Sequence, residues 1–70
     1  NIIIISNLKK KYLNILMKGN KNTTEIANYF NVDFKSSFRR LKELENLGLV
    51  RRKEDKKWEK LNPDKKVIVL

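Results

Sequence analysis

The segment Asn22–Val50 reads NTTEIANYFNVDFKSSFRRLKELENLGLV and decides the fold, because it carries two helix signals separated by a short break. Asn22 and Glu25 have the spacing of a capping box, in which each side chain accepts from the other residue's backbone N–H. Apolar residues then follow at helical spacing and predict one apolar stripe on this first helix: Ile26, Ala27 and Phe30.

The break is Asn31-Val32-Asp33, and a second helix is predicted from about Phe34 to Asn46. Asn tolerates the left-handed conformation that ends helices, and Asp is a good N-cap for the helix that follows. Gly48 is a natural stop. The periodicity predicts a buried face made of Phe34, Ser37, Leu41 and Leu44. The opposite face is basic and polar, with Lys35, Ser36, Arg39, Lys42 and Glu43, and the two faces are flanked by Arg40 and Phe38.

A short helix followed by a helix with one buried and one basic face is the pattern of a helix-turn-helix, whose second helix enters the DNA major groove. The stretch resembles the winged-helix DNA-binding domains of bacterial and archaeal transcription regulators of the ArsR and MarR type. The resemblance covers about Leu8 to Leu61. It is carried by Glu25-Ile26-Ala27 and by the ordered set Leu41, Leu44, Gly48, Leu49 and Val50.

The resemblance implies an α+β fold, a winged helix-turn-helix with three helices and a small antiparallel β-sheet that forms the wing hairpin. We expect one domain over residues 1–70, with the helix-turn-helix at 22–47 and the wing at 49–61. Ser37 departs from the family pattern, which usually has an apolar residue there. We expect this small polar residue to loosen the core, unless Phe34 and Phe38 fill the space.

Composition limits the possible functions. The 70 residues allow one domain, and the absence of Cys and His excludes disulfides, thiolate metal sites and an imidazole base. The formal charge of +9 favours a polyanionic partner: DNA, RNA or an anionic membrane surface. We found no paired acid and base and no glycine-rich phosphate loop, so we expect no enzymatic activity, no cofactor and no metal. No apolar run is long enough to span a bilayer, and we expect a cytoplasmic protein.

Two apolar runs lie at the ends of the sequence. Asn1–Ser6 contains four consecutive Ile, which favour a strand, and its possible partner is Val67–Leu70. We expect these runs either to close a small sheet or to form a homodimer interface. Between them and the central stretch, a helix capped by Ser6 or Asn7 is predicted to run to about Lys18.

The wing hairpin is predicted from strands at Leu49–Lys53 and Trp58–Leu61, joined by the turn Glu54–Lys57. Trp58 is expected to cap the core rather than to stack on a base. The whole predicted core is Tyr12, Ile15, Leu16, Ile26, Phe30, Val32, Leu41, Leu44, Leu47, Leu49 and Trp58.

These elements give a hypothesis of sequence-specific binding to double-stranded DNA. Lys35, Ser36 and Arg39 are expected to reach base edges, with Arg39 suited to a bidentate contact with guanine. Arg40 and Lys42 are expected to contact the flanking phosphates. Thr23 and Thr24, at a helix N-terminus, are expected to hold a phosphate. The wing is expected to add salt-dependent affinity through Arg51, Arg52, Lys53, Lys56 and Lys57.

Two other functions stay open. A winged helix can serve protein–protein interaction, and Phe38 on the flank of the second helix keeps that possibility. The chain can also be a replication or RNA-binding module of a larger assembly, although RNA recognition usually displays stacking aromatic residues and most aromatic residues here fall on core faces. The sequence does not identify an operator, an effector or an oligomeric state.

Overall fold

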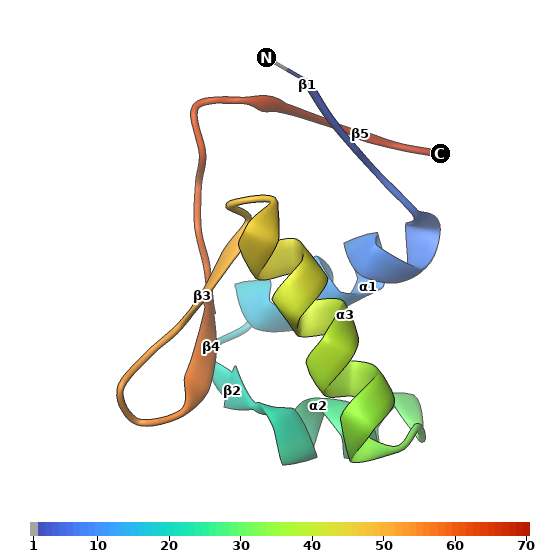
Figure 1. Ribbon diagram of the computed structural model, residues 1–70, viewed down its shortest axis with the longest axis vertical. Coiled ribbons are helices and arrows are strands. Elements are labelled where there is room, and N and C mark those ends of the chain that lie inside the picture. The colour runs from blue at the N-terminus through green and yellow to red at the C-terminus, as the bar shows by residue number, and fades with distance from the viewer. Residues whose placement is uncertain (1) are drawn as a thin grey trace.

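The computed structural model describes residues 2–70, so Asn1 of the predicted N-terminal segment lies outside it. Residues 2–70 form three helices, a three-stranded sheet and a two-stranded sheet. Figure 1 shows the helices in the middle, the larger sheet beside them, and the terminal strands across one end. In chain order the elements are β1 (Ile2–Ile5), α1 (Asn7–Met17), β2 (Lys21–Asn22), α2 (Thr23–Phe30), α3 (Phe34–Asn46), β3 (Val50–Arg52), β4 (Lys57–Lys60) and β5 (Lys66–Val69).

The predicted caps start all three helices. The Ser6 hydroxyl accepts from the backbone N–H of Lys9 at the start of α1. The capping box of α2 is complete: Asn22 Oδ1 accepts from the Glu25 N–H at 2.8 Å, and Glu25 Oε1 accepts from the Asn22 N–H at 3.0 Å. Asn31 ends α2 in the left-handed conformation with φ 55°, and Asp33 caps α3. These local bonds fix the turn between α2 and α3.

The three-stranded sheet is antiparallel in the order β2-β4-β3. The hairpin of β3 and β4 lies where the sequence predicted the wing hairpin, and we keep the name wing for residues 50–60. The sequence did not predict the third strand, β2, which is only two residues long and pairs Lys21 with Trp58 and Asn22 with Lys57. Since β2 leads directly into α2, this pairing ties the start of α2 to the β3–β4 hairpin. The arrangement is an α+β domain compatible with a winged-helix layout.

The turn of the wing is a three-residue loop. Lys53 donates its N–H to the Lys57 carbonyl at 2.8 Å, and Lys56 donates to the Lys53 carbonyl at 2.9 Å. Lys56 has φ 66°, the left-handed conformation that three-residue hairpin loops require at this point. A lysine there is strained relative to glycine.

The terminal strands pair with each other, as one of the two sequence hypotheses held, and form a separate two-stranded sheet. The pairing is parallel, with Ile4 opposite Ile68, and not part of the antiparallel sheet. Parallel strands need a long crossover, which the helices and the wing together provide. Ile3 and Ile5 point inward and join the core.

One core lies between the helices and both sheets. Most of the predicted core residues are buried, but Phe30 and Val32 are only half-buried. Two predictions were wrong. Leu47 is 36% exposed, because it is the C-cap of α3 and lies past the face that holds Leu44. Phe34 is 50% exposed, because the first turn of α3 extends beyond the core that Ser37 and later residues meet.

No helix within residues 2–70 combines the length and the apolar character needed to cross a membrane.

Candidate nucleic-acid interface

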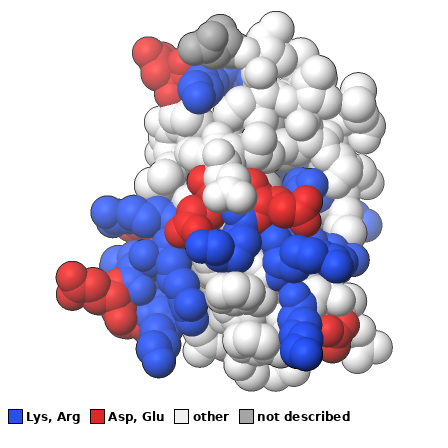
Figure 2. Space-filling view, viewed as in Figure 1, with Lys and Arg blue, Asp and Glu red and all other residues white. Residues whose placement is uncertain are grey.

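The outer face of α3 carries the basic residues that the sequence assigned to base contacts. Lys35 and Arg39 are exposed, and among residues 2–70 no carboxylate lies within ion-pair distance of either. Figure 2 shows that Lys and Arg side chains gather over α3 and the wing hairpin. Lys42 differs from this pair, because its ammonium contacts Glu45 Oε1 at 2.6 Å. Lys35 and Arg39 are therefore the exposed cations of α3 that have no carboxylate partner among residues 2–70.

The start of α3 is organised around the Asp33 carboxylate. Its Oδ1 accepts from the Ser36 hydroxyl at 2.7 Å and its Oδ2 from the Ser36 backbone N–H at 3.1 Å. These two bonds, with a smaller contribution from the positive charge of Arg39, lower the pKa of Asp33 below 3.8. Ser36, predicted to reach a base edge, thus has its hydroxyl proton engaged and offers its oxygen as an acceptor.

Arg40 and Ser37 meet the core through one tyrosine. The Tyr12 hydroxyl lies 3.1 Å from Ser37 Oγ and accepts from Arg40 Nη1 at 3.2 Å. Ser37 is fully buried and hydrogen-bonded, so it does not loosen the core as the sequence suggested; it fills the position with a polar contact. Arg40 is half-buried, and only part of its guanidinium remains for the flanking phosphate predicted for it.

Thr23 and Thr24, predicted together as phosphate contacts, separate in the structure. Thr23 is only 2% exposed, and its hydroxyl accepts from Trp58 Nε1–H at 2.9 Å. The side-chain contact predicted for Thr23 does not fit this structure, because the hydroxyl lies inside and bonds the indole. Thr24 is exposed beside it at the N-terminus of α2. The same bond explains why Trp58 lies in the core, as predicted, since a buried indole N–H needs an acceptor.

Three aromatic rings run from the core to the first turn of α3; we call Phe34, Phe38 and Trp58 the aromatic row. The Phe34 and Phe38 rings are nearly parallel, at 8°, with centroids 6.1 Å apart. Phe38 meets Trp58 edge-on at 6.0 Å. The guanidinium of Arg52, from the wing, lies 5.3 Å from the Phe38 centroid and 5.6 Å from that of Trp58. Cation–π attraction therefore joins the wing to α3.

A groove of about 390 Å³ opens between the start of α2, the start of α3 and the wing. Its polar and charged lining includes the exposed Thr24, the guanidinium of Arg52 and the ammonium-bearing Lys56, and Phe34 supplies an apolar wall. We call it the wing groove; it is lined by Asn22, Thr23, Thr24, Phe34, Arg52, Asp55 and Lys56.

The remaining cations of the wing differ in how free they are to contact a ligand. Arg51 contacts Glu59 Oε1 at 2.8 Å across the hairpin, and Lys53 is half-buried. Lys56 and Lys57 are exposed at the tip, where Glu54 and Asp55 are also exposed. The tip therefore presents two lysines together with two carboxylates.

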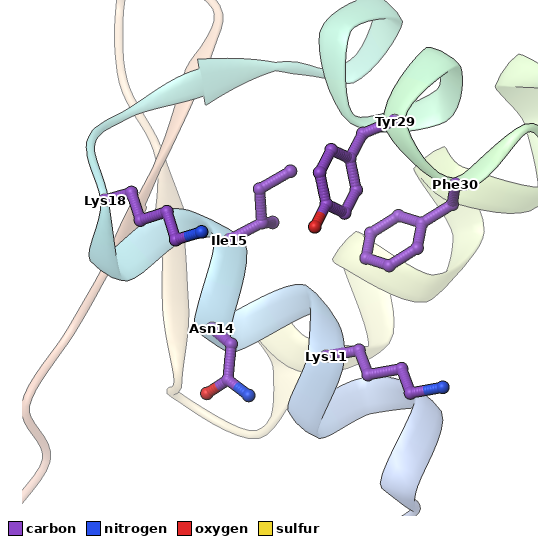
Figure 3. Close-up of a pocket in the computed structure, with 6 residues that line it drawn as sticks. All are labelled: Lys11, Asn14, Ile15, Lys18, Tyr29 and Phe30. Atoms are coloured by element: carbon purple, nitrogen blue, oxygen red, sulfur yellow. The ribbon is translucent and has the colours of Figure 1, made fainter.

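A second concavity lies away from this surface, between α1 and α2. Figure 3 shows the rings of Tyr29 and Phe30 near Ile15, with Lys18, just past the end of α1, on one side and Lys11 of α1 on the other. Its volume is about 430 Å³, and none of its lining residues belongs to α3 or to the wing. Within residues 2–70, no group of three or more acidic side chains is placed to hold a metal ion.

The chain matches no protein-family model, no curated protein and no solved structure.

Proposed function

We propose that this chain is a winged-helix domain that binds double-stranded DNA sequence-specifically, as part of a cytoplasmic transcription regulator. The observation that carries the proposal is the division of α3 into two faces. One face buries Leu41 and Leu44 in the core, and the other exposes Lys35 and Arg39 without a carboxylate partner among residues 2–70. A helix held in this way can enter the major groove with its cations toward the bases.

In the proposed complex, α3 reads sequence. Arg39 projects from the middle of the exposed face and has the planar fork that matches the two acceptors of guanine in the major groove. Lys35, one turn earlier, reaches the neighbouring base pair or its phosphate. The exposed hydroxyl of Thr24, at the start of α2, suits a phosphate.

The wing supplies affinity more than specificity. Lys56 and Lys57 are exposed at the hairpin tip, where the nearest groups of a docked duplex are phosphates. The chain has a formal charge of +9, and its cations displace the counterions condensed on DNA when it binds, so the affinity falls steeply as the salt concentration rises.

A second copy of the chain is the partner proposed for the terminal sheet. Ile2 and Ile4 are exposed on its outer face, although parallel sheets are normally covered on both faces. Figure 2 shows fewer charged side chains at this end than over α3 and the wing, although Lys66 of β5 is exposed in register with Ile2. Two copies that each carry +9 meet there with the least repulsion. A two-fold dimer would offer two α3 helices to a palindromic site.

The test is selection of bound sequences from a random duplex pool, followed by affinity measurements on an enriched and a scrambled duplex. Lys35→Ala combined with Arg39→Ala should weaken binding to the enriched duplex more than to the scrambled one, and so reduce discrimination between the two. The matched control is Lys11→Ala combined with Lys18→Ala, which removes the same charge from the concavity between α1 and α2. Equal losses in both variants would show attraction by net charge alone, and no enrichment would favour the protein-interaction alternative.

A further inference from the structure

Phe34 stands apart from the other apolar residues of α3. It is half-exposed at the first position of the helix, whereas Leu41 and Leu44 are fully buried. An aromatic ring is not needed to begin this helix, because Asp33 provides the cap. A single exposed apolar side chain is common on protein surfaces. Phe34 differs because its ring stacks on Phe38 and forms a wall of the wing groove, and this placement suggests a ligand contact.

The ring is held from the core outward. It stacks against Phe38, which packs edge-on against Trp58, and Trp58 is anchored by its hydrogen bond to Thr23. Arg52 covers Phe38 from the wing side. A side chain fixed in this way loses little rotational freedom when it contacts a ligand. Less of the free energy gained by burying its apolar surface is therefore offset by lost entropy.

The chemistry of the major groove decides which group Phe34 can meet. In a duplex the base faces are stacked on one another, and only the base edges are offered to a protein. These edges carry hydrogen-bond donors and acceptors, and one apolar group, the C5-methyl of thymine. Lys35 and Arg39 can donate to acceptors on the edges, but a phenyl ring can bond none of them.

We propose that Phe34 contacts the C5-methyl group of one thymine, and so specifies thymine at one position of the preferred duplex. The inference rests on the proposed function and deepens it by naming a residue and the base that it reads. Arg52 and Lys56, which line the same groove, supply positive charge for the phosphates on that side of the duplex. The thymine lies beside the base pairs that Lys35 and Arg39 read.

The other nucleic-acid reading makes a different prediction. If the chain bound single-stranded RNA or DNA, Phe34 would stack on the face of an unpaired base, which has no requirement for the methyl group. A loss of affinity when that methyl group is removed from a duplex therefore distinguishes the duplex hypothesis from the single-strand hypothesis.

The experiment replaces each thymine of the selected duplex, one at a time, by deoxyuridine, which lacks only the methyl group. The wild-type chain should lose about three- to fivefold in affinity at one position, the factor expected for one buried methyl group. Phe34→Ala should bind the thymine and deoxyuridine duplexes equally. Phe34→Leu should keep part of the difference, and Tyr29→Ala, which removes another exposed ring, should keep all of it.

Each ratio compares two duplexes on one protein, so partial unfolding of a variant cancels. Equal affinity of the wild type for every deoxyuridine duplex would overturn the inference and leave DNA binding intact. Methyl sensitivity that persists in Phe34→Ala would assign the contact to another residue and also overturn it. If no duplex is enriched at all, the proposed function fails first and the inference fails with it.

Discussion

At the scale of single residues, Thr23 shows how a hydroxyl at a helix N-terminus can be structural. From the sequence, Thr23 and Thr24 are equivalent, because both begin a helix and both suit a phosphate. The difference between them comes from Trp58, which lies 35 residues away and pairs with β2. Only the tertiary fold brings the indole N–H to Thr23, so no local signal could have separated the two threonines.

Thr23→Val should lower the free energy of unfolding by about 1–3 kcal/mol, because it leaves the buried Trp58 N–H without an acceptor while keeping the volume of the side chain. Thr24→Val, at the exposed neighbouring position, should change it by less than about 0.5 kcal/mol. Denaturant unfolding of both variants measures the difference. Equal stabilities would mean that the indole finds another acceptor and that the bond is dispensable.

Arg39→Ala should cost about 1–3 kcal/mol of binding free energy on the selected duplex and relax the preference at one base position. Arg39→Lys keeps the charge but loses the planar fork, so it should retain affinity for a scrambled duplex and lose discrimination. Titrations of the three proteins on both duplexes test this. A loss of the same size on both duplexes in Arg39→Ala would make Arg39 a phosphate contact.

Asp33 predicts a pH dependence of stability. Hydrogen bonds from Ser36 lower its pKa below 3.8 in the folded chain, so the ionised form favours folding. That contribution is complete above the ordinary pKa and is lost as pH falls through the lowered one. Asn caps helices as well but cannot titrate in this range. The stability difference between the wild type and Asp33→Asn should therefore be constant above about pH 5 and shift toward the variant below pH 3.8. A difference that does not change with pH would contradict this assignment.

At the scale of elements, the helices followed from the sequence because their signals are local. Asn22, Asp33 and Ser6 each cap through a residue three positions later, which is visible in the sequence itself. The bounds of α3 were predicted as Phe34 to Asn46 and are the observed ones. The exposed basic face of α3 followed from the same periodicity.

Elements that depend on partners distant in the chain could not be predicted from the sequence. β2 has two residues and no strand pattern, and it exists because β4 offers it an edge. The exposure of Phe34 was missed because periodicity gives the direction of a side chain but not how far the core extends along a helix. The sequence also could not predict that β1 and β5 pair in parallel, because strand propensity is the same for parallel and antiparallel strands.

The turn of the wing carries a strained residue, which gives a prediction about stability and binding together. Lys56→Gly should raise the free energy of unfolding by a few tenths to about 1 kcal/mol, because glycine adopts φ 66° without a steric cost, partly offset by the entropy it adds to the unfolded chain. Lys56→Ala removes the same charge and keeps the strain, so its stability should stay near that of the wild type.

Both Lys56 variants should reduce the dependence of log affinity on log salt by about 1, the value for one phosphate contact. Denaturant unfolding and a salt series on a scrambled duplex measure the two effects separately. An unchanged salt dependence in both variants would remove the wing tip from the DNA surface. A stability gain in Lys56→Ala equal to that of the glycine variant would show that charge repulsion, and not backbone strain, is relieved.

At the scale of the whole molecule, the surface divides into two regions. On the face seen in Figure 2, Lys and Arg side chains gather over α3 and the wing, and fewer lie at the end that holds β1 and β5. A chain of 70 residues buries a modest core, so an uncovered apolar sheet face is a notable loss of possible burial. This arrangement would suit the proposed DNA binding, because a partner that joins the end with β1 and β5 leaves the basic surface of α3 and the wing free.

Ile4→Lys should therefore convert a dimer into a monomer without unfolding it, because Ile4 is 57% exposed in the single chain and lies in the middle of the outer sheet face. On a palindromic duplex with half-sites about 10 base pairs apart, the wild type should bind cooperatively and the variant should bind each half-site independently. Tyr29→Lys is the matched control, since it adds the same charge at a side chain that is 66% exposed but lies on α2. Sedimentation with and without the duplex measures the assembly. A wild type that stays monomeric on the palindrome would remove the second copy as the partner of this face, and a dimer that survives Ile4→Lys would place the interface elsewhere.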